Sequence, residues 1–328
     1  MRIGVISQNL AEAVYTPALD ESSIINLAPD LYIEMTQEDG RVPCTTSIIR
    51  PYLLINYNHL ECVSLNGGQK THQNIMINVF IKNGVVNPVL AKGSAVIAPK
   101  ASSFRLGLQT MAKALHTGYG YSKGMVYVKI HTNKRPILFI NMHLPVKTKV
   151  VKGVLKNATL GLEFRRASFL ELLNKLDKDG LFIDNPVLFV SGDLNFRMDK
   201  TGRNQLNDIL RTESSLFYNL KELMQPEGEK RITCKFVTTN KTCRMKKMPL
   251  NDKMAFLEEI QSECGNSMRI PSRCDRFLIS KDLPVNVLLN TVKYLVESSD
   301  HNAILCCFDL IEKPASMYRR TNKLRSNK

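Results

Sequence analysis

The pattern of apolar and polar positions predicts a chain built mainly of short strands. Apolar, β-branched runs, typical of strands buried on both faces, occur beside stretches in which apolar and polar residues alternate. Residues 51–66 and 72–82 alternate and are joined by an NGGQ turn at 66–69, which predicts a hairpin. Strands are predicted at 2–10, 31–35, 51–66, 72–82, 93–99, 124–131, 136–144, 187–190, 231–238, 274–280, 284–296 and 303–311.

Apolar residues at helical spacing predict a smaller number of helices. Residues 158–179 have the clearest pattern, with Leu162, Phe169 and Leu176 on one face, and the arginine pair 165–166 is expected to face solvent. Helices are predicted at 22–28, 101–119, 158–179, 203–224 and 252–264. No linker or internal repeat divides the chain, so we expect one α/β domain over residues 1–312.

Composition and charge point to an anionic partner. An apolar fraction of 44% in 328 residues is sufficient for a buried core. The formal net charge is +15, of which six charges fall in residues 313–328, leaving +9 for residues 1–312. Such an excess favours nucleic acid, an anionic membrane surface or a phosphorylated small molecule. The basic tail 313–328 is expected to be disordered.

The cysteines and the N-terminus indicate an intracellular, cytoplasmic protein, with membrane association or nuclear import possible through the basic tail. Eight cysteines are scattered without a CxxC pair, so we expect reduced, mostly buried thiols and neither zinc nor a disulfide framework. The first ten residues resemble a strand rather than a signal peptide. No apolar run reaches the length needed to cross a bilayer.

Polar side chains recur where the predicted apolar strands end or begin. They are Asn9, Glu38, Asn141 with His143, Asp193 with Asn195, Asp275, and Asp300 with His301. Gathered at one edge of a sheet, these groups would suit hydrolysis of a phosphate ester. Carboxylate and amide oxygens are ligands of Mg²⁺. A carboxylate can orient or deprotonate water, and imidazole and amide groups can donate to phosphoryl oxygens.

Several segments together resemble the endonuclease/exonuclease/phosphatase superfamily, and within it the inositol polyphosphate 5-phosphatases. The segments are SQNL, PDLYIEMTQED, FINMHL, SGDLNFR, MRIPSRCDRFLIS and SSDHNAI, in the order of the family. The resemblance implies a DNase I-like, four-layer α/β sandwich of two mixed sheets flanked by helices. It also implies a Mg²⁺-dependent phosphomonoesterase that removes a phosphate, above all the 5-phosphate, from inositol polyphosphates or phosphoinositides by in-line attack of water.

The resemblance also implies a role for individual residues. The catalytic positions are Asp193, Asn195, His143, His301 and Asp275, with Asp275 supporting His301. The metal positions are Glu38, Asn9 and Asp300. The substrate-binding positions are Lys123, Lys235, Arg276, Asn141 and Arg269.

Departures from the family pattern concern the residues that recognise the substrate. Cys234 replaces the tyrosine of the family's TYK segment, Met268 replaces a lysine, and Arg273 replaces the tryptophan before CDR. The segment between Lys235 and Pro271 is also longer than expected and basic. Two alternatives therefore stay open: a metal-dependent nuclease on the same scaffold, and an inactive protein that binds a phosphorylated ligand or nucleic acid.

Overall fold

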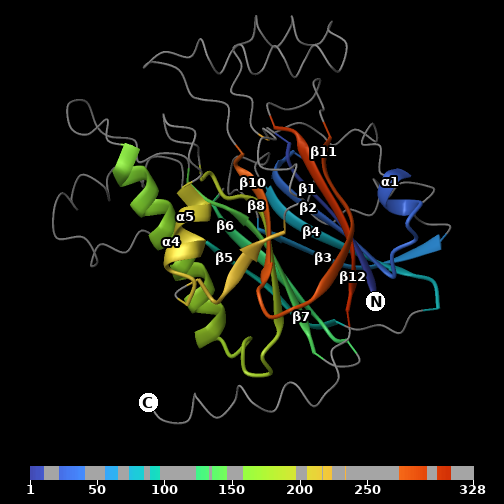
Figure 1. Cartoon of the computed structure of the whole chain (residues 1–328). Helices are drawn as coiled ribbons and strands as arrows, with labels where there is room; N and C mark the ends of the chain where they lie inside the picture. The colour runs from blue at the N-terminus through green and yellow to red at the C-terminus, as the bar shows by residue number, and fades with distance from the viewer. Residues whose placement is uncertain are drawn as a thin grey trace, which may run out of the picture.

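The computed structural model describes the chain in segments. These are residues 1–10, 22–40, 56–65, 74–84, 89–96, 123–132, 135–145, 158–196, 205–215, 217–223, 233, 273–293 and 301–311. Two six-stranded β-sheets pack face to face, and helices cover their outer faces (Figure 1). The predicted α/β sandwich of two mixed sheets is confirmed. No helix of the described residues is long and apolar enough to span a membrane.

The first sheet, sheet A, has the strand order β11-β12-β1-β2-β4-β3. Its strands are β1 (Arg2–Asn9), β2 (Leu31–Asp39), β3 (Tyr57–Leu65), β4 (Asn74–Lys82), β11 (Val285–Lys293) and β12 (Ala303–Leu310). Strands β1 and β2 are parallel, and the other neighbours are antiparallel. The antiparallel pair β3–β4 confirms the hairpin predicted from alternation.

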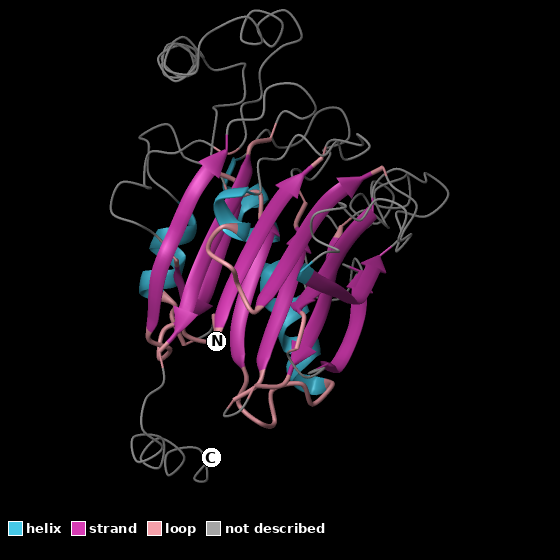
Figure 2. Ribbon diagram, turned by 90° about the vertical axis from the view of Figure 1, so that its right-hand side faces the viewer, coloured by secondary structure: helices cyan, strands magenta, loops and turns pink. Residues whose placement is uncertain are grey.

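The second sheet, sheet B, has the order β5-β6-β7-β8-β10-β9. Figure 2 shows the strands of the sandwich lying side by side. Its strands are β5 (Val89–Val96), β6 (Gly124–Ile130), β7 (Ile137–His143), β8 (Val187–Asp193), β9 (Leu220–Glu222) and β10 (Asp275–Ser280). Only β7 and β8 run parallel among these described strands. Sheet B therefore also has a central parallel pair, whose carboxyl ends share one edge.

The main core lies between the two sheets. Phe189 of β8 stacks on Phe308 of β12, with ring centroids 5.6 Å apart and planes 14° apart, and it also contacts Phe139 and Phe277. Each such ring contributes about 1.5–3 kcal/mol when fully buried. Alternation along each strand gives every second residue to this core, so the polar residues that continue the series at the strand ends face the same space.

Helices cover the outer faces: α1 (Ser22–Ile25) on sheet A, and α4 (Ala158–Lys178) and α5 (Gln205–Thr212) on sheet B (Figure 1). The prediction of α4 is confirmed, and Phe169 and Leu176 are buried as expected. The expectation that Arg165 faces solvent is wrong. It is buried, and its guanidinium carbon lies 5.9 Å from the centre of the Phe196 ring, where a cation–π contact offsets part of the cost of burial.

The single helix predicted at 203–224 is also wrong. Helix α5 ends at Thr212, and residues 220–222 form β9, which pairs with β10. Pairing with a strand that lies far along the chain decides the conformation there, and local periodicity cannot show it. The predictions at 101–119, 252–264 and 313–328, and all of 231–238 except Thr233, lie outside the described residues.

The cysteines are only partly as expected. Cys274, Cys306 and Cys307 are free and buried. Cys62 is disulfide-bonded, so the expectation of reduced thiols throughout is wrong for this position. Disulfides persist in oxidising compartments and are rare in the cytosol. The intracellular location stays a prediction.

Candidate active site

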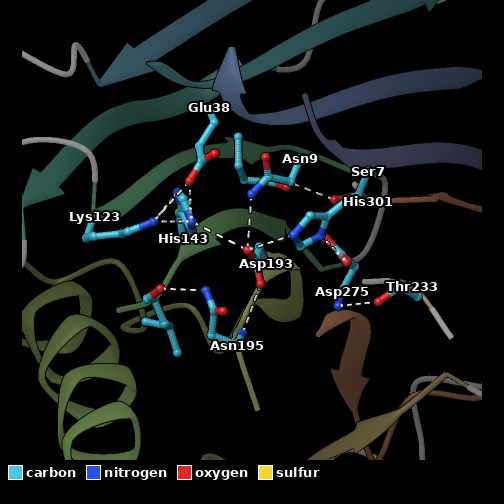
Figure 3. A network of polar contacts seen from close by, with 12 residues as sticks. Ser7, Asn9, Glu38, Lys123, His143, Asp193, Asn195, Thr233, Asp275 and His301 are labelled. Atoms are coloured by element: carbon cyan, nitrogen blue, oxygen red, sulfur yellow. Dashed lines mark hydrogen bonds and ion pairs between the residues drawn. The ribbon is translucent and has the colours of Figure 1, made fainter. Parts of the chain in front are cut away.

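Polar side chains from both sheets meet at one rim of the sandwich (Figure 3). Sheet A contributes Asn9 at the end of β1 and Glu38 near the end of β2. Sheet B contributes His143 and Asp193, which end its two parallel strands. Asp275 begins β10 on the same side, and His301 precedes β12. Carboxyl ends of parallel strands and amino ends of their antiparallel neighbours share an edge, and this brings the six side chains together.

Strand register places three of these residues side by side in sheet B. His143 and Asp193 are partners across the parallel pair β7–β8, and Asp275 is the partner of Asp193 across β8–β10. All three are buried and lie on the face of sheet B that points toward sheet A. Asp193 is therefore flanked on both sides by polar residues at the level where the apolar core ends.

Gly192 allows β7 and β8 to come this close. Its φ is +119°, and a Cβ atom there would lie 2.1 Å from the carbonyl oxygen of Met142. No side chain fits at this distance, and the backbone conformation itself strongly favours glycine. The glycine of the SGDLNFR segment is therefore required for the packing of β7 against β8 as well as for the turn.

Glu38 reaches the site because β2 contains a bulge. The register of β2 against β4 shifts between Thr36 and Asp39, so β2 has one residue more than its partner. Glu38 lies in this bulge with φ +47°, a left-handed conformation that is uncommon for a residue with a long side chain. Asn195 has φ +54°. Such conformations cost roughly 1–3 kcal/mol and cluster at functional sites.

Asp193 is the centre of the contacts (Figure 3). Its Oδ2 atom accepts a hydrogen bond from Asn9 Nδ2 at 3.1 Å and lies 3.5 Å from His143 Nε2 and 3.7 Å from His301 Nε2. Its Oδ1 atom accepts a bond from the backbone N–H of Asn195 at 3.1 Å. The carboxylate is thus held from both sheets.

The charges around Asp193 and Glu38 keep both carboxylates ionised. Burial by itself would raise the pKa of Asp193, but His301, His143 and Lys123 outweigh it, and the pKa lies well below its ordinary value of 3.8. Burial also opposes ionisation of Glu38. His143 and Lys123 overcome this effect, so the pKa of Glu38 is lowered as well.

His301 is held by Asp275. Its Nδ1 atom lies 2.8 Å from Asp275 Oδ2, which leaves Nε2 on the side of Asp193. Burial raises the pKa of Asp275, and this effect exceeds the opposing attraction of His301. Thr233 supports the pair, since its hydroxyl accepts from the Asp275 N–H at 2.9 Å and its carbonyl accepts from the Asn302 N–H at 2.7 Å.

Lys123 lies on the opposite side of the site from His301 (Figure 3). Its Nζ atom donates to Glu38 Oε1 at 3.3 Å and contacts the ring nitrogens of His143. Burial lowers the pKa of Lys123, against the opposing effect of Glu38 and Asp193. The Lys123 side chain is 9% exposed, whereas the Glu38 side chain is 26% exposed. Glu38 is therefore the more open of the two toward solvent.

The donor set fits a divalent cation. Glu38, Asn9 and Asp193 offer carboxylate and amide oxygens, the hard ligands that Mg²⁺ prefers. Asp193, Asp275 and His301 also have ligand atoms that lie within 4.8 Å of one another. A metal position at this rim therefore agrees with the chemistry of the residues present. Asp300, the third predicted metal position, lies outside the described residues.

The predicted substrate-binding residues, unlike the predicted catalytic residues, do not gather at the rim. Lys235 and Arg269 lie outside the described residues. Asn141 is fully buried below the site and bonds to backbone carbonyls of sheet A. Of the predicted substrate-binding positions, only Lys123 reaches the site among the described residues. The roles of these residues remain predictions.

Arg276 does not lie where the sequence-based assignment needs it. It is fully buried, and its Nη1 atom pairs with Glu222 Oε1 at 2.7 Å, while Arg273 pairs with the same oxygen at 3.1 Å. Successive residues of a strand point to opposite faces, so Arg276 lies across sheet B from its neighbour Asp275. The position of Arg276 therefore contradicts a contact with substrate.

Two polar residues beside the site were not predicted. Gln37 bonds to Asn141 at 2.7 Å, and Thr233 holds Asp275 as described above. Gln37 precedes Glu38 inside a run that the sequence marks as a strand end, so its polarity was visible. Its partner on β7 is 104 residues away and could not be read from spacing.

A family model described as endonuclease/exonuclease/phosphatase family 2 matches residues 91–306, about two thirds of the chain. The chain belongs to this family. Family members are phosphate-ester hydrolases, and the rim of polar residues lies where both sheets supply side chains for that chemistry. A search of curated proteins finds no match to this chain.

Solved structures with the same fold include proteins of different function. The inositol polyphosphate 5-phosphatase domain of SPsynaptojanin, in complex with inositol (1,4)-bisphosphate and calcium, is 16% identical, with a TM-score of 0.59 over 94% of this chain and 83% of that one. The human nocturnin catalytic domain with bound sulfate is 16% identical, with a TM-score of 0.50 over 94% and 95%. Cimex nitrophorin in a ferrous NO complex is 12% identical, with a TM-score of 0.54 over 95% and 98%. At such low identities the structural likeness shows the fold alone, and the function has to be inferred from the site.

Proposed function

We propose that this chain is a Mg²⁺-dependent phosphomonoesterase that removes the 5-phosphate of an inositol polyphosphate or a phosphoinositide. The observation that carries the proposal is the arrangement around Asp193. An ionised carboxylate lies between two imidazoles, and the carboxylate of Glu38 lies 3.5 Å from one of them. Cationic and donor groups beside carboxylates at one rim suit a phosphate ester better than a neutral ligand.

A cation bound at Glu38 and Asn9 would neutralise phosphoryl charge and polarise the scissile bond. Asp193 is best suited to orient the attacking water, because a carboxylate with a strongly lowered pKa is a weak base at neutral pH. Asn195 is well placed to donate to a phosphoryl oxygen only if its amide turns, since its Nδ2 atom donates to the Leu144 carbonyl at 2.8 Å. Asn195 therefore also fixes the turn after β8.

The histidines supply donors on both sides of Asp193. With Nδ1–H of His301 donating to Asp275, the Nε2 atom of His301 faces the side of Asp193, and the protonated ring would donate its Nε2–H to a phosphoryl oxygen there. His143 lies on the other side, between Asp193 and Glu38. Charge that builds on the phosphoryl group during in-line attack would thus meet a donor on each side.

The test is phosphate release from a panel of soluble inositol phosphates and of phosphoinositides in anionic vesicles. We expect release from substrates that carry a 5-phosphate, its loss with EDTA and its return with Mg²⁺. Asp193→Asn should lower kcat by about 100-fold or more, whereas Ser191→Ala, two residues earlier on β8, should leave kcat unchanged. Release that EDTA does not affect, or that Asp193→Asn leaves intact, would overturn the proposal. The two arms of the panel also separate a soluble from a lipid substrate.

The basic charge of the chain favours a nuclease as the second candidate. Cleavage of plasmid DNA or RNA that depends on Mg²⁺ and is lost in His301→Ala, without phosphate release from the panel, would establish it. An inactive binding protein is the third candidate, and Cimex nitrophorin shows that a protein of this fold can carry a ferrous NO complex. The joint presence of Asp193, Asn195 and His301 at one rim argues against an inactive protein.

A further inference from the structure

Asn141 joins the two sheets directly below the site. It belongs to β7 of sheet B, and its side chain is fully buried. Its Nδ2 atom donates to the carbonyls of Thr36 at 2.9 Å and Met76 at 2.8 Å, both in sheet A. Its Oδ1 atom accepts from Gln37 Nε2 at 2.7 Å. One side-chain amide thus uses both hydrogens and its oxygen on two strands of the opposite sheet.

These bonds end next to the active-site side chains on both sheets. On sheet A, Gln37 immediately precedes Glu38, inside the β2 bulge. On sheet B, Asn141 lies two residues before His143, and its register partner on β8 lies two residues before Asp193. The Asn141 amide therefore connects strand β2, which carries Glu38, with strand β7, which carries His143 and pairs with the strand of Asp193.

A buried amide at this point has a consequence that an apolar side chain would not have. Apolar contacts between sheets are non-directional and allow the sheets to shift. Hydrogen bonds to two backbone carbonyls fix both distance and direction. Since the candidate site is divided between the sheets, its geometry depends on how they are spaced at this level. A misplacement of about 1 Å at a reacting centre can cost about 100-fold in rate.

We propose that Asn141 is a positioning residue that sets the spacing between Glu38 on sheet A and His143 with Asp193 on sheet B. It acts through Gln37 and the carbonyls of β2 and β4 and does not contact the substrate. The proposal replaces the assignment of Asn141 as a substrate contact. Its kinetic consequences rest on the proposed phosphoesterase function, whereas its geometric consequence does not.

The geometric test compares crystal structures of the wild-type chain and Asn141→Ala. Glu38 Oε1 and His143 Nε2 lie 3.5 Å apart. In the variant we expect these atoms to separate by about 1 Å or more, since Thr36 and Met76 lose their bridge to β7. Asn141→Ser, which keeps one hydroxyl donor, provides a milder variant if the alanine variant does not fold. An unchanged separation in the variant that crystallises would overturn the proposal.

The kinetic test measures kcat and the Mg²⁺ concentration for half-maximal activity, well below the unfolding temperature. For Asn141→Ala we expect kcat to fall about 100-fold and the half-saturating Mg²⁺ concentration to rise several-fold. Ser191→Ala is the matched control, because Ser191 is the buried register partner of Asn141 and its hydroxyl has no hydrogen-bond partner among the described residues. It should change neither value.

A second control separates positioning from stability. Phe139→Leu, on the same strand and in the apolar core, should lower the unfolding temperature while leaving the Mg²⁺ dependence unchanged. If Asn141→Ala lowers the unfolding temperature but keeps the wild-type kcat and Mg²⁺ dependence, Asn141 is only structural and the proposal fails. If the wild-type chain hydrolyses no phosphate ester, the proposed function fails, and the crystal comparison alone decides the role of Asn141.

Discussion

His301 and Asp275 form a hydrogen-bonded pair at the rim of the sandwich, with 2.8 Å between Nδ1 of the imidazole and Oδ2 of the carboxylate. The pair fixes which ring nitrogen faces Asp193, 3.7 Å away. Asp193 and Asp275 are register partners across β8–β10, so the strand pairing that forms sheet B also places Asp193 beside the His301–Asp275 pair.

Replacing Asp275 by asparagine should therefore impair catalysis more than folding. The amide can keep a hydrogen bond, but it can favour the wrong tautomer of His301 and cannot stabilise the protonated imidazole. We expect kcat for phosphate release to fall by about 100-fold or more, with KM little changed. Steady-state kinetics over pH 5–9 would measure kcat and KM of the variant and of the wild type. A variant with wild-type kcat and pH profile would show that Asp275 has no part in orienting His301.

The stability of the chain should depend on acid through Asp193. Its pKa is lowered in the folded chain, so the unfolded chain binds more protons below the ordinary pKa of 3.8. The contribution of Asp193 is complete above that pH and is lost as the pH falls, by about 1.4 kcal/mol for each pH unit. Urea unfolding at pH 3–6 should show that the gap in unfolding free energy between wild type and Asp193→Asn narrows toward pH 3.

Asp275→Asn provides the contrast for this measurement. The pKa of Asp275 is raised by burial, so its carboxylate weakens folding once the pH exceeds its ordinary value of 3.8. As the pH rises from 3 to 6, the unfolding free energy of the wild type should therefore fall relative to that of Asp275→Asn, opposite to the change expected for Asp193→Asn. Parallel behaviour of the two variants would contradict the assignment of opposite shifts to these neighbouring carboxyls.

Gly192→Ala should destabilise the chain strongly. The added Cβ would meet the Met142 carbonyl at 2.1 Å, which requires β7 and β8 to separate. We expect a loss of about 3 kcal/mol or more in the free energy of unfolding. Gly84→Ala is the control, since Gly84 also has a positive φ but no atom lies within 4 Å of an added Cβ. It should cost about 1–2 kcal/mol, from backbone strain alone. Equal losses in urea unfolding would contradict the steric explanation.

Arg276→Leu should reduce stability without a matching change in substrate binding. Removing one member of a buried ion pair typically costs about 3–5 kcal/mol, but Glu222 keeps Arg273 as a partner, so we expect about 2–4 kcal/mol. Urea unfolding measures the loss, and KM should stay within about two-fold of wild type, because a fully buried residue on the far face of sheet B has no access to substrate. A rise in KM of about ten-fold would show instead that Arg276 contributes to substrate binding.

Much of the fold was predictable because strands and helices have local periods. The hairpin β3–β4, helix α4 and the buried strands β7 and β8 follow from which residues are apolar. The strand ends that carry the candidate site were predictable in the same way, because polar residues such as Asp193 and His143 follow buried strands. A polar residue at a strand end is equally typical of a turn, so the roles of these residues came from the resemblance of their segments to a known family.

The sequence by itself thus determined the α/β class, most of the strands and the residue types at their ends, since these depend on neighbours a few positions away. Only the tertiary structure decided how buried polar groups are used. Arg276 is internal because Glu222, 54 residues away, neutralises it, and Asn141 bridges the sheets because backbone carbonyls lie opposite it. The physical reason is that the cost of burying a polar group depends on partners brought together by folding, and a local pattern contains no record of them.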